Sequence, residues 1–100
     1  MFYNGVNAKV GGDPAVPPGT FCGGQVLMDR ADPTRVVRRC TTFFLRPDQP
    51  FERSGQVANV CFLEGLVRFR GKWLLYYGTA DSRIAVAWCD AAVAPAAASD

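Results

Sequence analysis

The side chains of this chain that could do chemistry are carboxylates, tyrosines and basic residues, because the sequence contains no histidine. A Ser-His-Asp or Cys-His arrangement therefore cannot be built from this chain alone. Acid–base work would have to use carboxylates, tyrosine or lysine. Two carboxylates have unusual neighbours: Asp81 lies in a short polar segment between two apolar runs, and Glu64 lies inside an apolar run.

These two carboxylates each allow a structural and a functional interpretation. An aspartate in a turn commonly accepts hydrogen bonds from its own backbone, so Asp81 need not be a ligand-binding residue. A buried carboxylate without a partner is costly, so Glu64 needs either an ion pair, with Arg68 or Arg53, or a wet cavity. The residues alone leave these alternatives open.

The cysteines do not indicate a metal site. Their spacing contains no CxxC pair, and no histidine completes a common zinc site. We expect four reduced, buried thiols, because free cysteine packs like a small hydrophobic residue. The four are Cys22, Cys40, Cys61 and Cys89. No metal or organic cofactor is expected.

Composition excludes some functional classes. The net charge is only +2 and the arginines are scattered, so no basic stripe for nucleic acid is present. No apolar run reaches the roughly 18–20 residues of a membrane span. The first residues, MFYNGVNAKVGG, lack the basic region and apolar core of a signal peptide. We therefore expect neither nucleic acid nor membrane as a partner.

The first half of the chain predicts short strands separated by loops. Phe2-Tyr3 should end a strand at an Asn4-Gly5 break, and the glycines and prolines of residues 8–20 favour a loop. A strand should run from Thr20 to Met28, with Gly23-Gly24 weakening or bulging it. A turn at residues 32–34, a short strand at 34–39 and an irregular connection at 46–55 should follow.

The second half predicts an antiparallel meander. We expect strands at 60–69, 72–77 and 84–88, joined by turns at Arg70-Gly71 and at residues 80–83. Alternate positions are apolar on both faces, so the sheet should be covered on both sides, by neighbouring modules or by the N-terminal half. Trp73 and Trp88 are expected to pack in the core. The alanine-rich end, residues 90–100, should be a disordered tail.

Several segments, in order, resemble glycoside hydrolase family 130. They are YNGVN (3–7), DPTRVV (32–37), FLRPDQPFERSGQVANV (44–60) and FLEGLVRFRGKWLLYYGTADSRIAVA (62–87). The resemblance implies an all-β fold, a five-bladed β-propeller of antiparallel blades with its active site in the central channel. Residues 1–89 would be its C-terminal portion. The family cleaves β-mannosidic linkages by phosphorolysis or hydrolysis, so the expected partner is a mannose-containing oligosaccharide.

The resemblance also implies what this chain lacks. The aspartate that protonates the leaving oxygen lies in the N-terminal half of the family fold, and nothing here aligns with it. We therefore expect no catalytic residue in the chain and no activity from it alone. Inorganic phosphate would be a co-substrate if the reaction is phosphorolysis. The protein would then be cytoplasmic, whereas a hydrolase could be exported.

Five residues become candidate substrate ligands through the resemblance. Asp81 matches an aspartate that binds sugar hydroxyls, which suits a carboxylate with several acceptor sites. Asn4 stands where phosphorylases of the family carry a phosphate-binding histidine, and asparagine cannot carry charge. This substitution favours hydrolysis. Glu64 could face the channel, an aromatic face at Tyr77 or Tyr76 could stack on sugar, and Arg53 could bind substrate from its loop.

Two competing hypotheses remain from the sequence. The chain could be a non-catalytic β-module that binds carbohydrate or serves a structural interaction, or a small β-sandwich of unrelated role. If it is part of a propeller, its two-sided apolar strands should expose a face and promote self-association.

Overall fold

The computed structural model describes residues 1–91, and these residues form an almost entirely β fold. The elements in chain order are β1 (Phe2–Val6), β2 (Phe21–Met28), β3 (Val36–Arg39), α1 (Pro50–Arg53), β4 (Cys61–Phe69), β5 (Lys72–Thr79) and β6 (Arg83–Asp90). The predicted all-β class with antiparallel strands is confirmed. No helix within residues 1–91 has the length and apolar character needed to cross a membrane.

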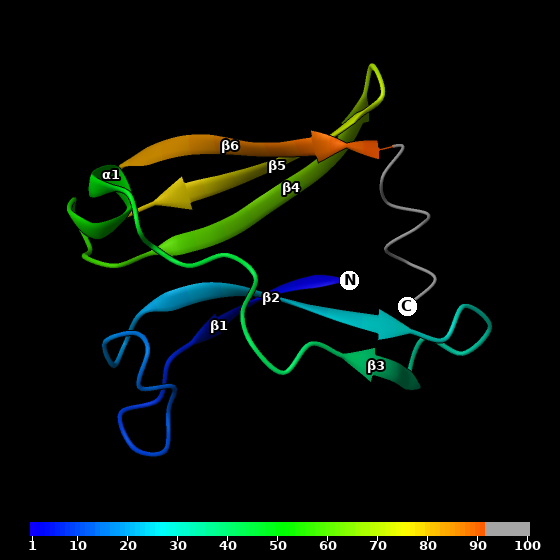
Figure 1. The fold of residues 1–100 in the computed structure, drawn as a ribbon, viewed down its shortest axis with the longest axis horizontal. Coiled ribbons are helices and arrows are strands. Elements are labelled where there is room, and N and C mark those ends of the chain that lie inside the picture. Colours follow the sequence, from blue (N-terminus) through cyan, green and yellow to red (C-terminus); the bar gives the residue numbers. More distant parts are fainter. Residues whose placement is uncertain (92–100) are drawn as a thin grey trace.

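The strands form two separate antiparallel sheets, each with its strands in chain order (Figure 1). The first sheet is β1-β2-β3, and the second is β4-β5-β6. α1 and the long connection from β3 lead from one sheet to the other. Consecutive antiparallel strands that pair in chain order are the unit of a propeller blade, so the arrangement agrees with two blade-like sheets.

The first sheet differs from the prediction at Asn4-Gly5. The sequence predicted a break there, but β1 continues through both residues, which pair with Gly23 and Cys22 of β2. An Asn-Gly pair is only a local turn signal, and here the paired backbone and a distant partner of the Asn4 side chain outweigh it. The bulge expected at Gly23-Gly24 was also misplaced, because the irregular register lies between Leu27 and Met28.

The connection expected to be irregular contains one helical turn, α1. Pro50 occupies the first turn, where its missing N–H is not needed. The carboxylate of Glu52 accepts the backbone N–H groups of Asp48 and Gln49 at 3.0 and 2.9 Å. Glu52 is nevertheless only 2% exposed. This buried acid therefore stabilises the helix start from inside the fold.

The second sheet confirms the predicted meander. The Arg70-Gly71 turn has positive φ at both residues, 49° and 76°, as tight hairpin turns require. β6 extends to Asp90, two residues beyond the predicted end, and the Ala91 N–H donates to the Gly71 carbonyl. Residues 92–100, most of the predicted tail, lie outside the described residues.

The two faces of this second sheet are in different environments. One face contains Cys61, Leu75, Tyr77 and Thr79, all buried. The opposite face, which we call the open face, is exposed at most of its apolar side chains, although the sequence predicted cover on both sides. Its exposed members are Phe62, Val67, Phe69, Tyr76, Ile84, Val86 and Trp88. Trp88 is 60% exposed, so its predicted core position was wrong.

The expectation of four buried thiols was half right. All four cysteines are free, and Cys22 and Cys61 are buried, but Cys40 and Cys89 are exposed. Cys89 lies near the end of β6 and Cys40 just after β3, at sheet margins where little of this chain packs.

The two sheets are joined at one seam. Isolated bridges connect Phe21 of β2 to Val60, the residue before β4, and Gly23 of β2 to Leu45 in the connection between β3 and α1. The Asn4 amide adds two hydrogen bonds across the seam: it donates to the Leu63 carbonyl at 3.2 Å and accepts the Leu63 N–H at 2.6 Å. The seam thus brings β1 beside β4.

Candidate functional site

Asp81 lies in the tight turn between β5 and β6. The Ser82 N–H donates to the Thr79 carbonyl at 2.9 Å, and the two central residues, Ala80 and Asp81, have φ of 49° and 51°. Positive φ at both central positions is the mark of a type I′ hairpin turn. The turn therefore fixes the backbone of Asp81 while leaving its side chain exposed.

Glu64 lies in a β-bulge of β4. Leu63 pairs with Tyr77 and Gly65 pairs with Tyr76, so Glu64 is the extra residue between two neighbouring pairs. Bulges commonly redirect one side chain out of a strand. The Glu64 carboxylate lies over Gly78 of β5, where a Cβ would be only 3.6 Å from Oε1. The bulge thus directs the Glu64 carboxylate over Gly78 at ordinary van der Waals distance.

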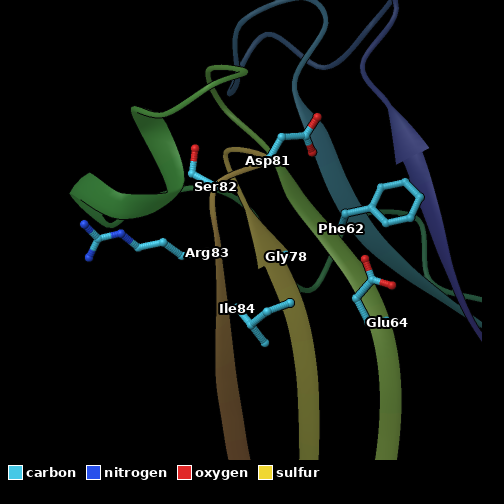
Figure 2. A pocket seen from close by; sticks show the side chains of 7 residues that line it. All are labelled: Phe62, Glu64, Gly78, Asp81, Ser82, Arg83 and Ile84. Carbon is cyan, nitrogen blue, oxygen red and sulfur yellow. The ribbon is translucent and has the colours of Figure 1, made fainter.

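Asp81 and Glu64 line one open pocket at the end of the second sheet, with a volume of about 430 Å³. Figure 2 shows both carboxylates with Phe62, while the Arg83 side chain extends toward α1. The complete lining is Phe62, Glu64, Gly78, Asp81, Ser82, Arg83 and Ile84. The pocket thus combines two acceptor groups with the apolar surfaces of Phe62 and Ile84.

The Glu64 carboxylate is not part of a structural ion pair within residues 1–91. The salt bridges in this part of the chain join Arg35 to Asp29 and Lys72 to Asp90. Arg68, one of the two expected partners, instead lies over the ring of Trp73. Glu64 is exposed, so the expectation of a buried carboxylate was wrong, and the charged group lines the pocket in contact with solvent.

Asn4 lies beside this pocket rather than in it. It lines a neighbouring, smaller hollow that also contains Glu64, Leu63 and Phe2. Its amide oxygen and nitrogen both bond to the backbone of Leu63. Asn4 therefore supports the strand that carries Glu64.

Tyr77 is far from solvent and bonded to another buried group. Its hydroxyl donates to Glu52 at 2.6 Å, and its side chain is on the covered face of the sheet. Burial of Glu52 raises the pKa of its carboxyl, but hydrogen bonds from Tyr77 and the backbone outweigh burial and hold the pKa below 4.5. Burial and the adjacent Glu52 raise the pKa of Tyr77 well above 10.0. The pair is thus a stable carboxylate and a neutral phenol.

The remaining candidates lie outside the pocket. Arg53 is exposed in the last turn of α1 and does not line the pocket. Tyr76 is 40% exposed on the open face. Of the five predicted ligands, the structure therefore brings Asp81 and Glu64 together and places Asn4 next to Glu64.

Sequence reasoning missed Phe62, Ser82 and Glu52. Phe62 precedes Glu64 by two residues, so strand alternation could have placed it on the same side. Ser82 adjoins Asp81 in the turn and could have been proposed for that reason. Nothing local marked Glu52, because its burial depends on Tyr77 of a distant strand. In the described part of the chain, no group of three or more His, Cys, Asp or Glu side chains could hold a metal ion.

A family model for glycoside hydrolase family 130, described as β-1,4-mannooligosaccharide phosphorylase, matches residues 19–93. Among curated proteins, the chain is 39% identical over 64 residues to a β-1,2-mannobiose phosphorylase from Thermoanaerobacter sp.. This match covers 64% of the chain and 21% of the relative.

Solved structures match with the same partial coverage. A glycosyl hydrolase from Bacteroides ovatus has a TM-score of 0.84 and 45% identity, over 89% of this chain and 25% of that one. A structure titled "The GH130 family of mannoside phosphorylases contains glycoside hydrolases that target beta-1,2 mannosidic linkages in Candida mannan" has a TM-score of 0.85 and 41% identity, with the same coverage. The chain thus spans about a quarter of these structures and a fifth of the curated relative.

Proposed function

Because the chain belongs to glycoside hydrolase family 130, we propose that it forms the C-terminal part of a five-bladed propeller enzyme that cleaves β-mannosidic linkages. In this proposal the chain contributes sugar-binding side chains to the active site. The observation that carries it is the shared pocket of Asp81 and Glu64, one carboxylate from the β5–β6 turn and one from β4, which line one space with Phe62.

The pocket has the chemistry that a sugar needs. Ionised carboxylates accept hydrogen bonds from several hydroxyl groups, and charged acceptors bind more strongly than neutral ones. The apolar faces of Phe62 and Ile84 offer surface for the C–H faces of a pyranose ring. A few placed polar groups on an apolar wall are the usual composition of a small-molecule site.

The chain supplies binding groups, and the acid that protonates the leaving oxygen lies in another part of the enzyme. Asp81 and Glu64 act as hydroxyl acceptors that orient the mannoside. A relative named β-1,2-mannobiose phosphorylase supports a mannoside as the substrate class. The proposed substrate is thus a mannose-containing oligosaccharide.

Hydrolysis is the reaction we favour over phosphorolysis. One N–H of the Asn4 amide donates to the Leu63 carbonyl and the amide oxygen accepts the Leu63 N–H, which leaves a single uncharged N–H where phosphorylases of the family carry a histidine. Among the solved structures, the one whose name refers to glycoside hydrolases is 41% identical to this chain, whereas a β-1,2-mannobiose phosphorylase from Listeria innocua is 30% identical. If phosphorolysis operates instead, inorganic phosphate is the co-substrate and other residues bind it.

The test is a titration of the ¹⁵N-labelled chain with β-1,2-mannobiose, followed by amide chemical shifts. We expect the shifts to change at Asp81, Glu64 and Phe62. Asp81→Asn removes the charge at constant size and should weaken the response. Asp29→Asn, which changes an aspartate remote from the pocket, is the matched control. A response confined to other residues, or an unchanged response in Asp81→Asn, would contradict the proposal.

A released-sugar assay with and without phosphate adds a second result. The chain alone should produce neither mannose nor mannose 1-phosphate, because the proposed acid is absent from it. Turnover by the chain itself would show that this assignment of the acid is wrong.

A further inference from the structure

The turn that carries Asp81 is conformationally strained at Ala80. Ala80 is not glycine, yet its φ is 49°, in the left-handed region that an alanine rarely adopts. Its side chain is also 0% exposed. Such a conformation persists only where the surroundings fix it more strongly than the local strain opposes it.

The surroundings that fix Ala80 come from the segment after α1, residues 55–60. The Ala80 N–H donates to the Val60 carbonyl, and the Ala80 carbonyl accepts the Val57 N–H, both at 3.0 Å. Both backbone polar atoms of Ala80 are thus bonded to this one segment. These two bonds to the 55–60 segment stabilise the turn, in addition to the hydrogen bond within the turn between Ser82 and Thr79.

Ser82 completes this attachment with its hydroxyl. Oγ donates to the Ala80 carbonyl at 3.1 Å and accepts the Gln56 N–H at 2.8 Å. A hydroxyl has one proton, and here that proton is directed to the protein backbone, away from any ligand in the pocket. Ser82 therefore lines the pocket without a free donor to offer.

Gly55 allows the close approach that these bonds need. A Cβ at Gly55 would lie 2.6 Å from the Ser82 Oγ and 2.7 Å from the Ala80 Cβ, far inside van der Waals contact. The segment and the turn can therefore pack this closely only if residue 55 is glycine, which has no side chain.

We infer that Ser82 is a positioning residue, whose hydroxyl ties the Asp81 turn to residues 55–57 and so holds the Asp81 carboxylate in the pocket. This inference rests on the proposed function for the sugar-binding role of Asp81. Ser82 acts through Asp81 and does not itself bind the sugar.

The test compares Ser82→Ala with Ser82→Thr, which keeps the hydroxyl, and with Ser54→Ala as a matched control. Ser54 is an exposed serine of the same region that does not line the pocket. Three quantities are measured on the whole chain: hydrogen exchange at the Gln56 amide, the backbone coupling constant that reports φ of Asp81, and the affinity for β-1,2-mannobiose.

We expect Ser82→Ala to speed exchange at Gln56 and weaken binding by about 5- to 10-fold, the effect of one lost hydrogen bond. The coupling constant of Asp81 should shift as well. Ser82→Thr should restore all three values, and Ser54→Ala should leave them unchanged. A merely structural serine would lower stability without moving the coupling constant of Asp81.

The outcomes separate this inference from the proposed function. If Ser82→Ala keeps both the coupling constant and the affinity, the positioning role is wrong. If Asp81→Asn binds the disaccharide like the unmodified chain, the proposed function is wrong. The hydrogen exchange at Gln56 and the coupling constant of Asp81 would still test whether Ser82 attaches the turn to residues 55–57. Rapid exchange at Gln56 in the unmodified chain would overturn the inference without any variant.

Discussion

The hydroxyl of Tyr77 donates a 2.6 Å hydrogen bond to the carboxylate of Glu52, and both side chains are almost completely buried. Glu52 lies in α1 and Tyr77 lies in β5, so this bond attaches the connecting segment to the covered face of the second sheet. The other oxygen of Glu52 accepts two backbone N–H groups. One acid therefore fixes both the start of α1 and its distance from the sheet.

Tyr77→Phe should destabilise the chain by about 1–3 kcal/mol, because it leaves a buried carboxylate oxygen without its donor. The midpoint of urea unfolding, followed by circular dichroism, measures this loss. Tyr76→Phe is the matched control, since Tyr76 is exposed on the open face. Equal midpoints for the two variants would show that the bond to Glu52 contributes nothing.

Stability should fall in alkali because two buried acids must stay protonated in the fold. Burial, reinforced by Glu52, raises the pKa of the Cys61 thiol from 9.0 to about 12, and the same causes raise the pKa of Tyr77. Groups with a raised pKa stabilise fully below their unfolded values and lose that contribution as pH rises through the interval.

We therefore expect the free energy of unfolding to decrease as the pH rises above about 9, where Cys61 begins to contribute, and more steeply above about 10, where Tyr77 also contributes. Urea midpoints across this range measure the slope. Cys61→Ala should make the slope shallower, and Cys89→Ala, at an exposed cysteine, should not. A slope that ignores Cys61→Ala would contradict the assignment.

Acid should destabilise the fold through Glu52. Its pKa lies below 4.5 in the folded chain, so its contribution is complete above pH 4.5 and disappears as pH falls through the folded value. Glu52→Gln should lower stability at pH 7 and reduce the acid dependence. If the variant retained the full acid dependence, another carboxyl group would have to be its source.

Asn4→Ala should weaken the seam between the two sheets. It removes both hydrogen bonds to Leu63 and leaves the Leu63 N–H and carbonyl without these partners. We expect a loss of about 1–3 kcal/mol, with faster amide exchange at Leu63. Asn59→Ala is not a suitable control, since Asn59 has a φ of 58°. Thr42→Ala, at an exposed position, serves instead. Unchanged exchange at Leu63 would contradict this role.

The open face should make the isolated chain self-associate. Large exposed apolar patches commonly mark surfaces that bind another protein surface. Val86→Lys places a charge in the middle of this face and should shift sedimentation toward the monomer. Val10→Lys changes a valine that is 90% exposed in a loop, away from the face, and should not. A monomeric unmodified chain at tens of micromolar would refute the expectation.

The second sheet was predictable because its signals are local. Continuous apolar strands and the Arg70-Gly71 turn fix the meander without help from distant residues. The position of the Glu64 side chain was not predictable. Glu64 lies in a bulge that forms because Leu63 pairs with Tyr77 and Gly65 pairs with Tyr76 of the next strand. The resemblance indicated Asp81, and the position of Glu64 in an apolar run drew attention to it, but only the fold shows that they share a pocket.

The errors share one physical cause. Asn4-Gly5 was predicted to break its strand, and Trp88 to be buried, from sequence neighbours alone. Asn4 is instead held by the backbone of Leu63, and Trp88 lies on a face that residues 1–91 do not cover. A non-local partner decides the first position, and the lack of cover within residues 1–91 decides the second.

The Asn4 bonds have a consequence for recombining such sheets. The asparagine recognises the N–H and carbonyl of position 63, which every residue except proline presents in the same way. These two bonds therefore require asparagine at position 4 but no particular side chain at position 63, whereas the Phe21–Phe62 ring contact across the seam does depend on side chains. A chimera could exchange β4–β6 for the corresponding strands of another protein and keep these two hydrogen bonds, provided that asparagine stays at position 4 and no proline enters at 63.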